Sequence, residues 1–282
     1  MAKAAKIGQN FLCDKNIASK IIDVFLPQAP GPVLEIGAGP GILSGMLLKK
    51  FSPGRVTLVE IDPALAENLR ERFGDRARVL EKNILTLDLT TLFPGVQHKS
   101  SAHPGGSDLS VPEGRINIIG NLPYHISKDL IDWFIAQRAA IATAVVMLQK
   151  DFVDKLLSPE NNKKYNAQSV VFQTFFRARR CFNVPAGAFQ PKPKIVSTVL
   201  AIGPGDPPLP AAAAGFYPFV RLCFGERRKT LANNLAPHFG KQALAAVAGA
   251  CGVSDQARAE QLPAERFSAL FAALSAGAAE RP

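Results

Sequence analysis

The residues best suited to chemistry in this sequence are the Asn-Leu-Pro-Tyr motif, which runs from Asn121 to Tyr124. An apolar run of strand length, residues 116–119, comes directly before it, so the motif stands where a buried strand should end. In an open α/β sheet, ligands bind at the carboxyl ends of the strands. An amide, a backbone carbonyl and an aromatic ring at that place can hold a flat base and accept hydrogen bonds from its amino group. The alternative is a turn that only terminates the strand.

A glycine-rich turn is the second candidate. Gly37 and Gly39 follow a predicted strand, residues 33–36, and precede a helix predicted over 42–51. Glycines let the backbone approach a ligand without a Cβ clash. The spacing is Gly-x-Gly-x-Gly, which lacks the dinucleotide fingerprint, and Pro40 has no N–H for a phosphate. The loop therefore suits a nucleoside without a pyrophosphate, with S-adenosylmethionine as the leading candidate. A purely structural turn is the alternative.

An acidic residue at the end of the next predicted strand, residues 55–61, supports a nucleoside ligand. Glu60 follows Gly39 by 21 residues, the distance at which a carboxylate accepts hydrogen bonds from ribose hydroxyls. Asp62 already has a role, because it can cap the helix that Pro63 begins. Glu60 is therefore the predicted ribose ligand, and a solvated charge at the strand end is the weaker alternative.

Together these motifs predict methyl transfer to an exocyclic amine. The lone pair of such an amine is delocalised into the base, so acceptors on its hydrogens would favour attack on a sulfonium methyl group. The side-chain oxygen of Asn121 and the carbonyl of Leu122 are the candidate acceptors, and Pro123 biases Leu122 toward extended backbone. Tyr124 can stack on the base, a contact worth ~1–3 kcal/mol in comparable complexes. This chemistry requires no metal.

Strand-length apolar runs alternate with amphipathic stretches, which predicts a doubly wound, mainly parallel α/β sheet. The predicted strands are residues 33–36, 55–61, 79–80, 115–119, 144–148 and 198–202. Residues 94–114, rich in Gly, Pro and Ser, are predicted to form a mobile surface loop. A proline-rich string, residues 203–210, predicts a boundary between an α/β domain over 1–206 and a helical domain over 207–282.

Composition narrows the class of protein. The chain has 282 residues, a net charge of +10 and four scattered cysteines without a Cys-x-x-Cys pair. The cysteines argue against a zinc site or a disulfide framework and suit a reducing cytosol. Neither a signal peptide nor an apolar run near the ~20 residues of a membrane span is recognisable. The positive charge predicts a nucleic-acid partner, and a basic surface that serves only solubility is the alternative.

The positive charge is clustered. Basic residues gather in four places: Lys163 and Lys164; Arg177, Arg179 and Arg180; Lys192 and Lys194; and Arg227, Arg228 and Lys229. Several clusters adjoin the proposed base site in sequence, so an RNA-binding surface is favoured over solvated charge, and its binding should weaken steeply with salt.

The sequence resembles the bacterial small-subunit (16S) ribosomal RNA adenine dimethyltransferase family over nearly its whole length. The matching motifs are Gly8 to Leu12, Glu35 to Gly41, Glu60 to Asp62, Asn121 to Tyr124, Phe189 to Ser197 and Phe224 to Leu231. The resemblance implies a Rossmann-like methyltransferase domain and a helical RNA-binding domain. Residues that it implies for S-adenosylmethionine are Asn10, Leu12, Gly37, Glu60, Asn83 and Asn121.

The resemblance also implies a substrate. Two adjacent adenosines in the 3′-terminal hairpin loop of 16S rRNA, within an immature small subunit, would each receive two methyl groups on N6. Tyr124 and Phe189 would sandwich the target base, while Lys192, Lys194, Arg227, Arg228 and Lys229 would bind RNA. A cytoplasmic monomer without a membrane partner is expected.

The chain departs from the family pattern at a few positions. Asn83 stands where an aspartate is usual near the adenine of the cofactor, which removes a charge and predicts weaker cofactor binding. Lys192 replaces a proline, Ala232 replaces an arginine, and Asn166 follows Tyr165 where glycine is usual. None of these changes removes an atom that the methyl transfer needs.

Two alternatives remain open on the sequence. One is an enzyme that methylates adenosine of the large-subunit (23S) RNA, which would share the cofactor loop and a similar base motif. The basic signature Arg227 to Thr230 favours the small-subunit family over it. The other is a catalytically silent ribosome-assembly or transcription factor of the same fold, against which the intact Asn-Leu-Pro-Tyr motif argues.

Overall fold

The computed structural model describes residues 10–26, 31–94, 114–205 and 215–279. Residues 95–113 of the predicted loop and residues 206–210 of the proline-rich string lie outside these ranges. Contacts divide the chain into two compact units. Unit 1 comprises residues 1–153 and 177–204, and unit 2 comprises residues 154–176 and 205–282. Unit 2 thus includes residues 154–176, which the predicted boundary after residue 206 assigns to the α/β domain.

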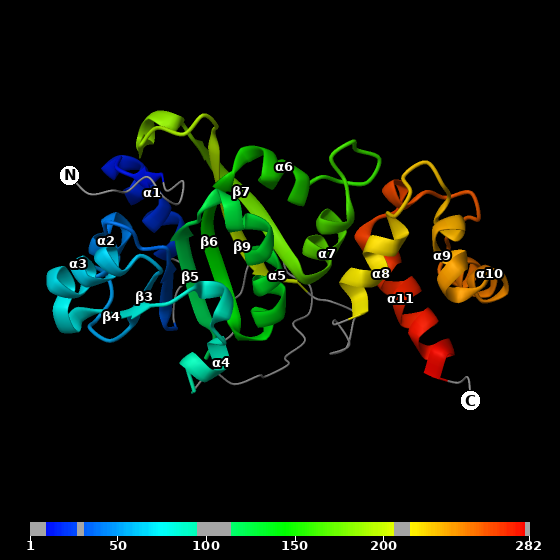
Figure 1. The fold of residues 1–282 in the computed structure, drawn as a ribbon, viewed down its shortest axis with the longest axis horizontal. Coiled ribbons are helices and arrows are strands. Elements are labelled where there is room, and N and C mark those ends of the chain that lie inside the picture. Colours follow the sequence, from blue (N-terminus) through cyan, green and yellow to red (C-terminus); the bar gives the residue numbers. More distant parts are fainter. Residues whose placement is uncertain (1–9, 27–30, 95–113, 206–214, 280–282) are drawn as a thin grey trace. The chain divides into compact units, whose positions relative to one another are not determined.

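Unit 1 is built on a seven-stranded sheet in the order β4-β3-β2-β5-β6-β9-β7 (Figure 1). The strands are β2 (Val33–Ile36), β3 (Val56–Glu60), β4 (Arg78–Glu81), β5 (Ile116–Asn121), β6 (Ile141–Gln149), β7 (Phe176–Val184) and β9 (Ser197–Pro204). The pairs among β4, β3, β2, β5 and β6 are all parallel, and β9 runs antiparallel to β6. The prediction of a mainly parallel α/β sheet is confirmed.

A second sheet has only two short strands. β1 (Phe11–Leu12) pairs antiparallel with β8 (Phe189–Gln190), with Phe11 opposite Gln190 and Leu12 opposite Phe189. The backbone N–H of Cys13 extends the pairing by donating to the carbonyl of Ala188 over 2.8 Å. The start of the described chain is thereby fixed to the segment before β9.

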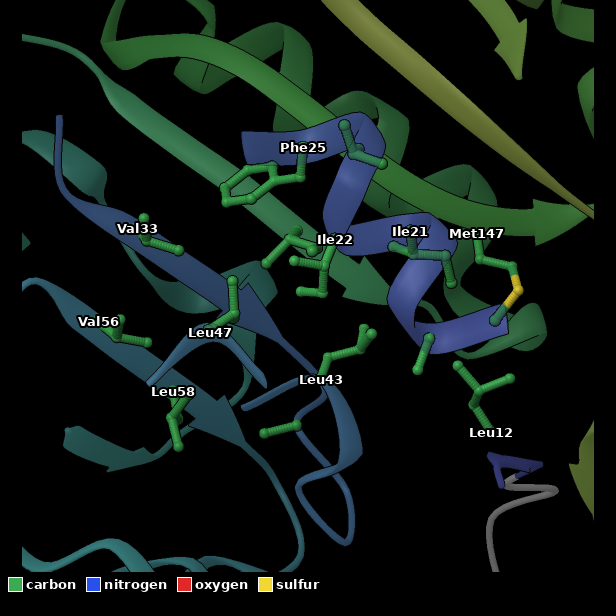
Figure 2. Close-up of a cluster of buried hydrophobic side chains, with 14 of the residues drawn as sticks. Leu12, Ile21, Ile22, Phe25, Val33, Leu43, Leu47, Val56, Leu58 and Met147 are labelled. Atoms are coloured by element: carbon green, nitrogen blue, oxygen red, sulfur yellow. The ribbon is translucent and has the colours of Figure 1, made fainter. Parts of the chain in front are cut away.

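Helices α1 (Lys15–Phe25), α2 (Ile42–Leu47) and α3 (Pro63–Phe73) cover one face of the sheet. Asp14 caps α1 and Asp62 caps α3, each by accepting two backbone N–H groups. Figure 2 shows side chains of α1, such as Ile22 and Phe25, packed with Val33 of the sheet and Leu47 of α2. Burying such side chains contributes roughly 1.5–3 kcal/mol each, which anchors the helices against the sheet.

The opposite face of the sheet is also covered. Ile119 and Val145 belong to the cluster under α1, whereas their neighbours Ile118 and Val146 point the other way and are equally buried. Helix α5 (Ser127–Gln137) packs against β6, and a shorter helix, α4 (Leu89–Leu92), precedes β5 (Figure 1). Two covered faces explain why these strands read as continuous apolar runs.

Unit 2 is helical and has an aromatic core. After α6 (Lys150–Leu156), which begins in unit 1, it holds α7 (Ala167–Phe175), α8 (Phe216–Cys223), α9 (Leu231–Phe239), α10 (Lys241–Ala250) and α11 (Ala264–Ala279). Phe175 of α7 packs edge-on to Phe216 of α8, and the hydroxyl of Tyr165 donates to the carbonyl of Leu262. These contacts explain why α7 belongs with the C-terminal helices. Asn166, unusual for the family, caps α7 in a capping box. No helix in the described ranges of either unit has the length and apolarity to cross a membrane.

Gly120 lets strands β2 and β5 approach closely, directly before the Asn-Leu-Pro-Tyr motif. It lies opposite Ile36 in the parallel pairing. A Cβ at this position would be 2.5 Å from the carbonyl oxygen of Ile36 and 3.0 Å from the side chain of Leu122. Only glycine fits this place without moving either strand.

We expect Gly120→Ala to destabilise the protein by about 1–3 kcal/mol, because the added methyl group overpacks a rigid strand pair. Urea unfolding followed by circular dichroism measures this. Gly187→Ala is the matched control, since a Cβ there meets nothing within 4 Å, and its unfolding midpoint should be unchanged. Equal stability of the Gly120 variant and the wild type would show that the strands can separate freely.

Candidate cofactor and target-base site

A cavity of about 230 Å³ lies at the carboxyl ends of β2, β3 and β5 in unit 1. It brings together most of the predicted site residues. Its walls include Asn10, Gly37, Gly39, Glu60, Asn83, Asn121, Leu122, Pro123 and Tyr124. Leu12 and Phe189 are not among them. The site therefore forms where an open parallel sheet is expected to bind its ligand.

The glycine loop turns through left-handed backbone. Gly37, Gly39 and Gly41 have φ values of 67°, 55° and 82°, which disfavour residues with a Cβ. A Cβ on Gly39 would also lie 3.1 Å from the ring of Phe11. The loop is thus compact and keeps its backbone at the cavity surface.

Glu60 holds this loop in place from the end of β3. One carboxylate oxygen accepts the N–H of Gly39 over 2.8 Å, and the other accepts the N–H groups of Ile61 and Asp62 over 2.9 and 3.0 Å. The side chain is buried yet lines the cavity. A carboxylate has about four acceptor positions, so three backbone bonds leave capacity for a ligand hydroxyl. The predicted role toward ribose is compatible with this geometry.

Glu35, the first residue of the glycine motif, lies elsewhere. It is buried and is not part of the cavity wall. Burial, with a smaller contribution from the negative charge of Glu60, raises the pKa of its carboxyl to about 8. The carboxyl is therefore mostly protonated at neutral pH. Of the two glutamates, Glu60 is the one whose side chain can meet a ligand in this cavity.

Asn83 follows β4 and starts the short 3-10 helix Ile84–Thr86. Its side-chain oxygen accepts the N–H of Leu85 over 3.0 Å, so the amide caps this turn. The amide oxygen has a second lone pair, so it can still accept from the amino group of an adenine. It accepts without the negative charge that an aspartate would bring.

Asn121, at the end of β5, has its amide oriented by the N-terminal segment. Its Nδ2 donates to the backbone carbonyl of Asn10 over 3.0 Å. The opposite side of a planar amide is its oxygen, so Oδ1 is the atom left to accept from a ligand. Asn10 and Asn121 are 111 positions apart in the chain, and no local pattern could have predicted their bond.

The remaining residues of the motif are equally constrained. The N–H of Leu122 donates to Met147 of β6, and Pro123 has extended backbone at φ −61° and ψ 131°. The hydroxyl of Tyr124 forms a 2.7 Å hydrogen bond with the hydroxyl of Ser197, the buried first residue of β9. Burial raises the pKa of Tyr124 above its ordinary value, so the phenol stays neutral at physiological pH.

Leu12 and Phe189, predicted to contact cofactor and base, are instead buried side by side. Phe189 is 2 % exposed and belongs to the apolar cluster that also contains Leu12 and Ala188. Because strand residues alternate in direction, Phe11 rather than Leu12 reaches the cavity. The sandwich of a base between Tyr124 and Phe189 stays a prediction, and in this arrangement Phe189 serves packing.

Several wall residues were missed by sequence reasoning, including Phe11, Ile61, Lys82 and His125. Ile61 is an apolar side chain that is 51 % exposed. Its position in the sequence, directly after the predicted ribose ligand Glu60, was the available signal, because an exposed apolar side chain there suits the face of an adenine. With Ile36, Val59 and Ile84 also in the wall, the cavity fits a nucleoside such as S-adenosylmethionine.

The predicted RNA-binding residues are exposed in both units. Lys192 and Lys194 lie on the segment before β9 in unit 1. In unit 2, Arg227 donates to the carbonyl of Lys163, and Lys229 pairs with Glu226 over 2.7 Å. Arg228 is exposed beside them. Their contact with RNA stays a prediction.

We expect Asn83→Asp to tighten S-adenosylmethionine binding by about 5-fold, because hydrogen bonds to a charged acceptor are stronger by roughly 1 kcal/mol. One carboxylate oxygen would keep the cap on Leu85, and the other would replace the NH₂ group. Isothermal titration calorimetry measures the dissociation constant. Asn233→Asp, an exposed change in unit 2, gives the same charge and should have no effect. A weaker or unchanged constant for Asn83→Asp would contradict this account of the cap.

Comparisons with known proteins point to one family. Residues 2–276 match the ribosomal RNA adenine dimethylase family. Ribosomal RNA small subunit methyltransferase A of Koribacter versatilis is 34% identical over 98% of this chain and 96% of its own length. The corresponding protein of Nitratidesulfovibrio vulgaris is 36% identical over 96% of both chains.

Solved structures share the fold. A dimethyladenosine transferase from Plasmodium falciparum matches with a TM-score of 0.75 at 21% identity, over 95% of this chain and 98% of that one. The 23S rRNA methyltransferase ErmE matches with a TM-score of 0.64 at 25% identity, over 94% of this chain and all of that one. On its sequence match and on the motifs gathered in its cavity, the chain belongs to the ribosomal RNA adenine dimethylase family.

Proposed function

We propose that this chain transfers methyl groups from S-adenosylmethionine to N6 of adenosines in ribosomal RNA. Its substrate is the pair of adjacent adenosines in the 3′-terminal hairpin loop of 16S rRNA, each of which receives two methyl groups. The small-subunit name of relatives at 34–36% identity supports this choice of RNA. The enzyme acts as a cytoplasmic monomer on immature small subunits.

The cofactor side of the cavity is formed by the parallel strands. Gly37 and Gly39 provide a backbone surface, Glu60 provides acceptors for the ribose, and Ile61 provides an apolar face for the adenine. Asn83, also in the wall, would accept from the adenine amino group. When bound, S-adenosylmethionine supplies an electrophilic methyl group on a sulfonium sulfur.

The observation that carries the proposal is the orientation of the Asn121 amide. Because Nδ2 is held by the carbonyl of Asn10, Oδ1 can accept one hydrogen of the target amine. The carbonyl of Leu122, which the following Pro123 biases toward extended backbone, can accept the other. Two acceptors concentrate electron density on the nitrogen, and holding them in place in advance lowers the barrier by positioning and electrostatics.

Tyr124 limits where the base can lie. Its ring borders the cavity, and its hydroxyl is tied to Ser197, so the ring has one preferred orientation. A base stacked on this ring would have its amino edge directed at Asn121 and Leu122. The partial burial of Tyr124 also excludes water from one side of the reacting amine.

The structure of ErmE, a 23S rRNA methyltransferase, has a similar fold. The fold alone therefore does not select the RNA. The more similar relatives by sequence carry the small-subunit name, which favours 16S rRNA as the substrate.

We expect Asn121→Ala to lower methylation by about 10²–10³-fold or more, because it removes one of two acceptors on the reacting amine. The assay transfers labelled methyl groups from S-adenosylmethionine to small subunits from a strain that lacks the modification. Mass spectrometry then maps the labelled nucleotides in the wild-type reaction.

Each outcome of this experiment is decisive. Labelling of two adjacent adenosines near the 3′ end supports the proposal, whereas labelling of large-subunit RNA alone would select the 23S activity. An absence of transfer by the wild type would favour a silent assembly factor. Equal labelling by Asn121→Ala, with the wild-type unfolding temperature, would overturn the role of Asn121.

The bond between Tyr124 and Ser197 can be tested by a double-mutant cycle. Ser197→Ala and Tyr124→Phe should each lower kcat/KM by about 2- to 10-fold, the value of one hydrogen bond. The double variant should be no worse than either single one, because all three lack the same interaction. A 2-aminopurine base in place of the target adenosine reports stacking through its fluorescence, and quenching should decrease in parallel. Additive losses would mean that the two hydroxyls act independently.

A further inference from the structure

Among the described strands, β7 is the last in the order of the seven-stranded sheet and is hydrogen-bonded to β9 alone. It differs from the other strands of that sheet in its charge. Arg177, Arg179 and Arg180 are all exposed, within the first half of the strand. The middle strands of the same sheet are almost wholly buried and apolar. Unit 1 therefore presents a strongly basic edge.

Two of these arginines form a regular pair. Arg177 and Arg179 alternate with Ala178, so their side chains leave the same face of the strand about 6.6 Å apart. No carboxylate in the described ranges forms a salt bridge with either of them. Arg180 points to the other face and makes an interaction of its own. Guanidinium groups bind phosphate oxygens in a bidentate manner, and this spacing resembles that of successive phosphates in one nucleic-acid strand.

Strand β7 runs toward the target-base site, and Arg177 and Arg179 lie in the half of the strand farther from it. The start of β7 lies beside the end of β9, where Gly205 donates to Phe175, and the end of β7 lies beside the start of β9, where Thr198 donates to Asn183. β7 ends at Val184, and after Pro185 the chain forms the short 3-10 helix Ala186–Ala188 and then β8. β8 pairs with β1, whose Phe11 lines the cavity. Nine residues thus separate Arg179 from the strand pair that borders the site.

The chain beyond β8 carries more positive charge. Lys192 and Lys194 are exposed, and Ser197 then forms its bond with the hydroxyl of Tyr124. Basic side chains therefore lie on both sequence flanks of β8, all within unit 1. The alternative is that these charges only prevent the sheet edge from pairing with other edges. That role would not require basic residues on both sides of the strand that borders the site.

We propose that Arg177 and Arg179 on β7 bind the phosphates of the RNA strand that leads to the target nucleotides. The inference rests on the proposed function and assigns part of the RNA-binding surface that this function needs. The partner is RNA, because the basic edge leads to a pocket built for a base. These arginines position the RNA and carry no sequence information.

The test compares Arg177→Gln/Arg179→Gln with Lys49→Gln/Lys50→Gln. The control pair is also exposed, follows α2 and removes the same charge far from β7 in the strand order. The probe is a labelled synthetic RNA hairpin with two adjacent adenosines in its loop. Binding is followed by fluorescence anisotropy over a series of KCl concentrations.

The arginine variant should reduce the slope of log K against log[KCl] by about one for each phosphate that is no longer bound, whereas the control should keep the wild-type slope. Arg177→Lys/Arg179→Lys should recover most of the slope, because the charge returns. S-adenosylmethionine affinity should be unchanged in all variants, which shows that the site is intact. If the double variant loses that affinity, Arg179→Gln alone should still reduce the slope by about one.

Equal slopes for the arginine variant and the control would overturn the proposal and leave the arginines as guards of the sheet edge. That result is distinct from failure of the proposed function, in which the wild type itself would neither bind the hairpin nor methylate small subunits.

Discussion

The site depends on one hydrogen bond, from the side-chain amide of Asn121 to the carbonyl of Asn10. An asparagine amide can rotate and exchange its donor for its acceptor, and a donor facing an amine would oppose the chemistry. The bond removes this ambiguity. It works only if Asn10 is itself held, which requires the pairing of β1 with β8 and the bond between Cys13 and Ala188. A short strand near the start of the chain thus sets the polarity of the reacting site.

The same dependence gives Leu12 and Phe189 a packing role, while their contacts with cofactor and base stay predictions. They lie opposite each other in the β1–β8 register and are buried in the apolar cluster of unit 1. Their packing fixes β1, and β1 fixes the amide of Asn121. A motif residue can therefore contribute to a ligand site without contacting the ligand, because its packing fixes the backbone of the residues that line the site.

Local signals in the sequence predicted much of the fold. β2 has the predicted bounds, and Asp62 caps the helix that Pro63 begins. β7 was not predicted, because an edge strand with arginines on both faces lacks the apolar run of a buried strand. The grouping of α7 with the C-terminal helices also escaped prediction, since it depends on packing such as that of Phe175 with Phe216 across a large sequence separation. The periodicity of a segment indicates that one of its faces is buried, but not which other segment it packs against.

The site follows the same division. The cofactor half of the site lies at the ends of parallel strands. Gly39 and Glu60, which are hydrogen-bonded there, each belong to a short motif that can be recognised in the sequence without the other. The target half requires a reversal: β9 runs antiparallel to β6, so its first residue, Ser197, comes to the edge where β5 ends. Tyr124 is thereby held by a residue 73 positions away. The Asn-Leu-Pro-Tyr motif predicts which groups meet the base, but the orientation of Asn121 and Tyr124 depends on β1 and β9, which only folding brings beside the motif.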